Sequence, residues 1–460
     1  MPPPRALGPR DKRLQSHRCK NCRRARTKCD GTRPCSTCRV RRVQCTEAVV
    51  PSQRQQPTFL HYLPELTTPH PSLDETASLE AFFAFVGSEP HSPISLQFTP
   101  TALRPYLCRP GPVKAVAAAI GALVSTKRQN PAANHLHTFA NTRRSLHSVL
   151  HVDADDPFSH LLFSLLLAIF EFLYESSGLG FFTVMNTAST RIIAKCVANS
   201  CPENNWLLVL YNWLDTGRAL YTREEPAPCP MTPPPPETSS AEQLVFYHIV
   251  KFLCLFSSLH SRVPRWLSQV VNFAEACPHC GQDPAGGSTL HCHPCGEQLV
   301  QQGHVALEEL QRLAIAVSEN AQATTDPKYW SSIAPAWYHA CAISMASLYA
   351  NEAWSSFDPD AVRPLVDSAN TGLPWPTRLD AIENRIAVVD FEVFSLLPIL
   401  LSLSLEVNDF GVRERIVALY NSIIAKGYAA GTFLRDGLTY LQSISLAQSQ
   451  LSLVGSSGSL

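Results

Sequence analysis

Six cysteines between residues 19 and 45 are the side chains of this sequence whose spacing best suits a definite chemistry. The segment reads CKNCRRARTKCDGTRPCSTCRVRRVQC, and each of its halves is a CxxC pair followed by a third cysteine after six residues. Zinc takes four ligands in a tetrahedron. Six thiolates fill either one site with two left over, or two sites that share two sulfurs, and the near-identical halves favour two sites. The candidate ligands are Cys19, Cys22, Cys29, Cys35, Cys38 and Cys45.

The same 27 residues are strongly basic, with nine Lys or Arg against one acid. They are too few and too polar to form a hydrophobic core, so metal binding must supply their folding energy. Arg and Lys donors suit guanine O6 and N7 in the major groove, and they also suit phosphates. The basic residues assigned to phosphates are Arg18, Lys20, Arg24, Arg33, Arg39, Arg41 and Arg42.

The segment resembles the fungal binuclear zinc cluster transcription factors. It has their two CxxC units, the basic run before the third cysteine, Cys29-Asp30, and Pro34 before the fourth cysteine. The resemblance implies that two zinc ions are bound and that Cys19 and Cys35 bridge them. It also implies that the first short helix enters the major groove and reads a CGG-type triplet. The matching base-reading residues are Arg23, Arg26 and Lys28, whereas Ala25 stands where the family often has a basic residue.

Charge divides the chain into a basic beginning and an acidic remainder. Residues 1–45 hold 14 basic and 2 acidic residues, and the other residues hold 24 basic and 36 acidic ones. A polyanion is therefore the expected partner of the beginning. No secretory signal is apparent, and the most apolar stretch, residues 158–174, is predicted to be a buried core helix. We expect a soluble nuclear protein without a membrane partner.

The fold is predicted to be mostly α: a small zinc-stapled DNA-binding module followed by a large all-helical regulatory domain. Residues 1–18 are expected to be a basic, disordered N-terminus, and 46–72 a linker whose prolines exclude a coiled coil. Residues 73–455 show helical periodicity, interrupted by a proline-rich loop at 224–240. This part resembles the fungal-specific regulatory domain that follows the zinc cluster in the same family. Within it, Leu310, Leu313 and Val317 are expected on one helix face, opposite Glu308, Glu309 and Arg312.

A second cysteine cluster at 277–296, CPHCGQDPAGGSTLHCHPCG, has the turns of a zinc knuckle. It predicts a third, structural zinc, with three histidines as competing ligands; the alternative is a disordered insertion that carries cysteines. The predicted ligands are Cys277, Cys280, Cys292 and Cys295, and the histidines are His279, His291 and His293.

The sequence contains no phosphate-binding loop, dinucleotide glycine pattern, HExxH or GxSxG, so no enzyme is predicted. We interpret the protein as a sequence-specific transcription regulator that binds double-stranded DNA and the transcription machinery. It would act as a monomer or as a homodimer formed by the helical body. The resemblance to the family implies a pathway-specific role in secondary metabolism. The alternative is a zinc-stabilised interaction protein that modulates another regulator without reading DNA.

Overall fold

The chain divides into two compact units, Met1–Glu65 and Leu66–Leu460, here called the head and the body. The computed structural model describes residues 19, 21, 22, 27, 29, 34–45, 75–87, 98–108, 110–130, 135–152, 156–199, 204–227, 229–233, 241–272, 293–323, 327–350, 354, 359–368, 375–388, 390, 391, 393, 396, 397, 400, 403 and 410–439.

The described part of the chain is helical and contains no strand, which confirms the mostly α prediction. The described part of the head includes α2 (Ser36–Val40). The body's helices are α3 (Glu75–Val86), α4 (Pro100–Leu107), α5 (Pro112–Gln129), α6 (His135–Val149), α7 (Pro157–Tyr174), α8 (Leu179–Thr187), the π-helix η3 (Ala188–Ile192), α9 (Ile193–Ala198), α10 (Asn205–Thr222), α11 (Ala241–Asn272), α12 (His293–Ala323), α13 (Pro327–Tyr349), α15 (Pro359–Asp367), α16 (Trp375–Val388) and α18 (Phe410–Ala425). Residues 431–439 form a further short helix.

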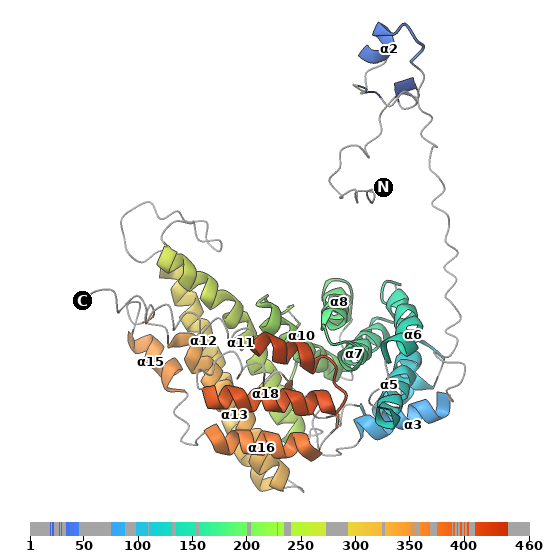
Figure 1. The fold of residues 1–460 in the computed structure, drawn as a ribbon. Coiled ribbons are helices and arrows are strands. Elements are labelled where there is room, and N and C mark those ends of the chain that lie inside the picture. Colours follow the sequence, from blue (N-terminus) through green and yellow to red (C-terminus); the bar gives the residue numbers. More distant parts are fainter. Residues whose placement is uncertain are drawn as a thin grey trace, which may run out of the picture. The chain divides into compact units, whose positions relative to one another are not determined.

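The body is a bundle in which neighbouring helices along the chain pack together. At one end α5 packs against α3, α6 and α7; at the other, α11, α12 and α13 pack in series (Figure 1). α7 and α10 connect the two groups, because α7 contacts both α5 and α10, and α10 contacts α11. Segments from both groups share one hydrophobic core.

α7 is the central core helix, as its sequence predicts. Asp156 caps it by accepting a hydrogen bond from the Phe158 N–H at 3.0 Å, and Pro157 occupies its first turn. Fifteen of its 18 residues are buried. By length and composition α7 and residues 243–267 of α11 could each cross a membrane. In the most apolar 18 residues of these two segments, however, 83% and 67% of the residues are buried inside the body. Packing among the other helices accounts for their apolar character.

One residue-level expectation is wrong. Leu310 and Leu313 of α12 are buried as predicted, but Glu309 is buried with them, at 1% exposed. Its carboxylate contacts His248, Lys251 and Arg312. His248 and Lys251 thus stabilise the Glu309 carboxylate between α11 and α12, although the helical periodicity predicted that this side chain faces solvent.

Candidate metal centre and nucleic-acid interface

Cysteine side chains form the buried centre of the described part of the head. Cys19, Cys22, Cys35 and Cys38 are at most 2% exposed, and the half-buried Cys29 and Cys45 pack against them. A cluster made of sulfur, without aliphatic or aromatic side chains, gives little hydrophobic stabilisation. Its stability must come from something that the sulfurs bind together.

The six sulfurs form two groups of four. In one group the Sγ atoms of Cys19, Cys22, Cys29 and Cys35 lie within 4.8 Å of one another, and in the other those of Cys19, Cys35, Cys38 and Cys45 do. Cys19 and Cys35 belong to both groups.

Individual sulfur–sulfur distances match a zinc–thiolate tetrahedron. Cys19 Sγ lies 3.8 Å from Cys35 Sγ and 3.5 Å from Cys38 Sγ, and Cys22 Sγ lies 3.6 Å from Cys35 Sγ. Zn–S bonds of about 2.3 Å in tetrahedral geometry require S–S edges of about 3.8 Å. The donor set and its spacing therefore fit two four-coordinate zinc ions.

Backbone hydrogen bonds hold the sulfurs, and they repeat with a shift of 16 residues. The Cys22 N–H donates to Cys19 Sγ at 3.3 Å, and the Cys38 N–H donates to Cys35 Sγ at 3.4 Å. The Cys19 N–H donates to Cys29 Sγ at 3.5 Å, and the Cys35 N–H donates to Cys45 Sγ at 3.4 Å. The sequence repeat is therefore also a structural repeat.

These amides also bear on the charge state of the thiols. The hydrogen bond from the Cys22 N–H lowers the pKa of the Cys19 thiol to about 6. Burial raises the pKa of the Cys38 thiol to about 12, and the pKa of the Cys35 thiol is also raised. Zinc binds the thiolate form, so these two thiols must lose their protons as the metal binds.

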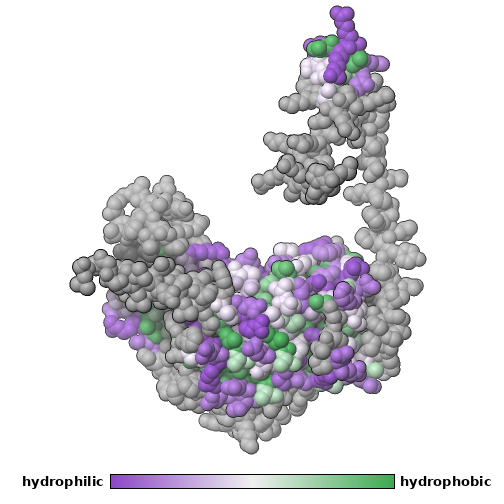
Figure 2. Space-filling model, in the orientation of Figure 1, coloured by the Kyte–Doolittle hydropathy of each residue, from purple (hydrophilic) through white to green (hydrophobic). Residues whose placement is uncertain are grey.

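α2 carries the described basic surface of the head. Its N-cap is Cys35, which ties the start of the helix to the sulfur cluster. Arg39, Arg41 and Arg42, at its end and just beyond, are exposed, and among the described residues none of them pairs with a carboxylate. Val40, which lies between them in the sequence, is 84% exposed. The coloured surface of the head accordingly shows hydrophobic residues among hydrophilic ones (Figure 2).

Several predicted site residues lie outside the described residues. The base-reading candidates Arg23, Arg26 and Lys28 are among them, as are the phosphate candidates Arg18, Lys20, Arg24 and Arg33. Of the second cluster, Cys277, Cys280 and Cys292 also lie outside, together with His279 and His291. His293 and Cys295 belong to the first turn of α12, and the Cys295 side chain is 8% exposed in the body's core. The third zinc site stays a prediction.

Comparison with known proteins identifies the head. Residues 17–55 match the family model described as the fungal Zn(2)-Cys(6) binuclear cluster domain. No curated protein and no solved structure matches the chain.

The chain thus carries a binuclear zinc cluster, a domain of non-enzymatic, DNA-binding transcription regulators. This domain binds two zinc ions, which confirms the two-site interpretation of the six cysteines.

Proposed function

We propose that the protein is a sequence-specific transcription regulator whose head reads CGG-type triplets and whose helical body regulates or assembles it. The observation that carries this proposal is the pair of four-sulfur groups that share Cys19 and Cys35. We assign these two cysteines as the bridging ligands, and the other four as ligands of one zinc each.

In this proposal the zinc ions fix the backbone, and basic side chains of the same segment bind DNA. Arg23, Arg26 and Lys28 lie in the first repeat, where the family places its reading helix, and their donors suit guanine O6 and N7. Arg39, Arg41 and Arg42 are exposed and have no carboxylate partner among the described residues, which suits them to contact phosphates.

The remaining parts of the proposal follow from the domain's family. Its members are generally nuclear, so we place this protein in the nucleus, acting with the transcription machinery on the genes of one secondary-metabolite pathway. The prolines of residues 46–72 predict that no coiled coil forms there. A homodimer would then form through the body; otherwise the protein binds as a monomer.

Selection from randomised DNA tests the function. The zinc-loaded full-length protein and residues 1–72 are used in parallel, and both are expected to enrich a CGG-like triplet. Paired triplets selected by the full-length protein alone would indicate that the body forms the dimer. If neither sample enriches any sequence although the head holds two zinc ions, the alternative of a zinc-stabilised interaction protein replaces this proposal.

Two arginine variants separate base reading from phosphate binding. Arg26→Ala is expected to weaken discrimination between the preferred and a mismatched site by about 1–3 kcal/mol while the head stays folded. Arg42→Ala is expected to weaken binding to both sites equally, because a phosphate contact carries no sequence information. An Arg26→Ala protein with unchanged discrimination would contradict the assigned reading helix.

A further inference from the structure

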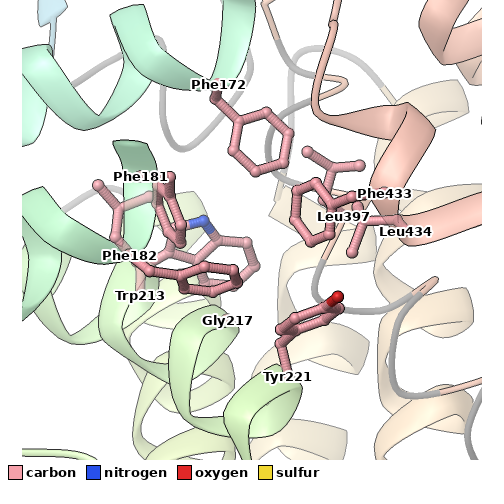
Figure 3. A pocket seen from close by; sticks show the side chains of 10 residues that line it. Phe172, Phe181, Phe182, Trp213, Gly217, Tyr221, Leu397, Phe433 and Leu434 are labelled. Carbon is pink, nitrogen blue, oxygen red and sulfur yellow. The ribbon is translucent and has the colours of Figure 1, made fainter. Parts of the chain in front are cut away.

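Two hollows in the described part of the body differ in the room that they offer a ligand. The aromatic pocket beside Trp213 and Phe433 (Figure 3) holds about 40 Å³, which suffices for no more than a few water molecules. The other lies where the ends of α5, α7 and α18 meet, and it holds about 370 Å³. This volume is within the range of roughly 300–1,000 Å³ of ordinary small-molecule sites.

Three basic side chains and one acid line the larger hollow, which we call the basic cavity. Lys127 and Arg128 come from the last turn of α5, and Lys426 directly follows α18. The acid is Asp390, so three positive charges and one negative charge give the lining a net charge of +2. Apolar side chains, among them Val124, form much of the remaining wall.

Two of the three cations already bind a carboxylate of the chain itself. Arg128 Nη2 lies 2.6 Å from Asp390 Oδ2, and Lys426 Nζ lies 3.6 Å from Asp390 Oδ1. A guanidinium group has five N–H donors in a planar fork, and Asp390 accepts a hydrogen bond from one of them. The other donors of Arg128 have no acceptor among the described residues, so they are available to a second anion.

The third cation, Lys127, joins the ends of two helices. Its Nζ donates to the Gly427 carbonyl oxygen at 2.6 Å and to the carbonyl oxygen of Leu173. Both carbonyl groups belong to residues that line the cavity, so the amine lies at its wall. An ammonium group has three N–H donors, and the third finds no acceptor in the part of the chain that the structure describes.

Burial has a cost for Lys127 that an anion would offset. Burial lowers the pKa of Lys127 to about 8, so its two carbonyl partners do not fully replace the water that the ammonium group has lost. A nearby negative charge favours the protonated form of a lysine. An anion in the basic cavity would therefore be stabilised by Lys127 and would stabilise it in turn.

The ends of the helices oppose this attraction in part. A helix C-terminus carries about −0.5 of an elementary charge, and α5, α7 and α18 all end at the cavity. Three such ends contribute about −1.5, which is less than the charge of +2 on the side chains. The cavity thus remains positive on balance.

We propose that the basic cavity binds a small organic anion, a carboxylate or a phosphate ester with an apolar part. Its oxyanion takes the remaining donors of Arg128 and is further attracted by Lys127 and Lys426, while the apolar part lies against side chains such as Val124. The bound anion would link α5 with the segment that follows α18. This proposal concerns the body alone and holds whether or not the head reads DNA.

Three naphthalene derivatives that share a ring system and differ in their polar group test the proposal. Full-length, zinc-loaded protein is titrated with 2-naphthoate, 2-naphthyl phosphate and the neutral 2-naphthamide by isothermal titration calorimetry at pH 7. We expect 2-naphthoate to bind saturably and 2-naphthamide at least about tenfold more weakly, because hydrogen bonds to an ionised group are the stronger ones. The tighter of the two anions identifies the class of ligand, carboxylate or phosphate ester.

Two variants should change the affinity for 2-naphthoate in opposite directions. Arg128→Gln is expected to weaken it about tenfold, as loss of one charge-assisted hydrogen bond predicts. Asp390→Asn is expected to strengthen it, because the ligand no longer competes with the carboxylate of the chain, and damage to the fold would not produce such a gain. Arg363→Gln is the matched control, since it breaks an Arg–Asp pair on α15, outside the cavity, and should have no effect.

All these proteins keep the same basic head, so binding of the anions to the head would not distinguish them. Melting temperatures show that each variant is folded, and 2-naphthamide should bind to all of them alike. The proposal is overturned if neither anion binds, or if 2-naphthoate and 2-naphthamide bind equally well. It is also overturned if folded Arg128→Gln and Asp390→Asn proteins bind 2-naphthoate as the unaltered protein does.

Discussion

At the scale of single residues, the proposed assignment gives each cysteine either one zinc ion or two, according to its place in the repeat. Cys35 belongs to both four-sulfur groups, whereas Cys45 belongs to one. Under the proposed bridging assignment, loss of Cys35 would remove a ligand from two zinc tetrahedra, whereas loss of Cys45 would leave the group of Cys19, Cys22, Cys29 and Cys35 complete. The two substitutions are chemically identical, so their comparison tests the bridging assignment.

Cys45→Ser is expected to lower the zinc content by one ion per chain, and Cys35→Ser by two. Native mass spectrometry of the full-length protein measures both against the unaltered chain, so a third zinc at residues 277–295 would not affect the difference. Cys108→Ser, at an exposed cysteine of the body, is the control and should lose none. Equal losses from the two head variants would show that Cys35 does not bridge.

Glu309 shows how residues of a neighbouring helix can determine whether a side chain is buried. Its carboxylate oxygens lie 2.5 Å from His248 Nδ1, 3.1 Å from Lys251 Nζ and 2.9 Å from Arg312 Nη1. Burial raises the pKa of Glu309, but the hydrogen bonds from His248 and Lys251 outweigh it and lower the pKa to about 2. The ordinary value is 4.5, so the stability that this carboxylate contributes is present above pH 4.5 and is lost as the pH falls towards 2.

Glu309→Gln is therefore expected to destabilise the body by about 1–3 kcal/mol at pH 7, a value that allows for the partial exposure of Lys251 and Arg312. It should also flatten the decline in melting temperature between pH 4.5 and 2. The adjacent Glu308→Gln serves as control, because Glu308 is 63% exposed and, among the residues that the structure describes, pairs with Arg312 alone, at 3.5 Å. If both variants melted alike across this pH range, the Glu309 cluster would not be a source of acid sensitivity.

The zinc ligands could be predicted from the sequence because their chemistry is local: all six lie within 27 residues, at spacings that few other functions require. Glu309 and Trp213 could not be predicted in the same way. The carboxylate of Glu309 contacts His248, which is 61 residues away in the sequence. The apolar pocket beside Trp213 is lined by residues of α8, of α10 and of the helix at 431–439. Periodicity along one helix indicates which face is apolar, but it does not indicate what the neighbouring helix presents.

At the scale of elements, composition predicted the helices but not their closest approaches. The sequence AAAIGALV indicates a buried helix, and α5 is one. Nothing in the pattern shows that α3 crosses it with backbone against backbone at Gly121. A Cβ atom there would lie 1.8 Å from the Ser78 carbonyl oxygen and 2.7 Å from the Phe82 nitrogen. The pairing of α3 with α5 therefore depends on this glycine.

Gly121→Ala is expected to destabilise the body by about 1–3 kcal/mol, because relieving the overlap requires a backbone shift. On helix propensity alone the same change would stabilise α5 by about 1 kcal/mol, so the two explanations predict opposite signs. Gly111→Ala, where a Cβ atom would meet nothing within 4 Å, should be nearly neutral. Thermal unfolding followed by circular dichroism distinguishes the two explanations. A Gly121→Ala protein that is more stable than the unaltered one would exclude the close backbone contact between α3 and α5.

At the scale of the whole molecule, the two units carry opposite charge on one chain. Residues 1–72 hold 15 basic and 4 acidic residues, a net charge of +11, and residues 73–460 hold 23 basic and 34 acidic ones, a net charge of −11. The head attracts DNA, while an acidic body on the same chain repels it. Such repulsion between exposed charges extends over about 30 Å at 0.01 M salt and about 8 Å at 0.15 M.

We therefore expect the body to weaken the non-specific DNA binding of the head, and to do so only at low salt. Fluorescence anisotropy on a short duplex with a single triplet should give residues 1–72 the higher affinity at 0.01–0.05 M salt, with the two affinities converging near 0.3 M. For both proteins the affinity should fall by about 0.9 log unit per neutralised phosphate for each tenfold rise in salt, and more steeply for residues 1–72. If the ratio of the affinities of residues 1–72 and of the full-length protein did not change with salt, the charge of the body would be too far from the bound DNA to repel it. Tighter binding by the full-length protein at every salt concentration would instead mean that the body makes DNA contacts of its own.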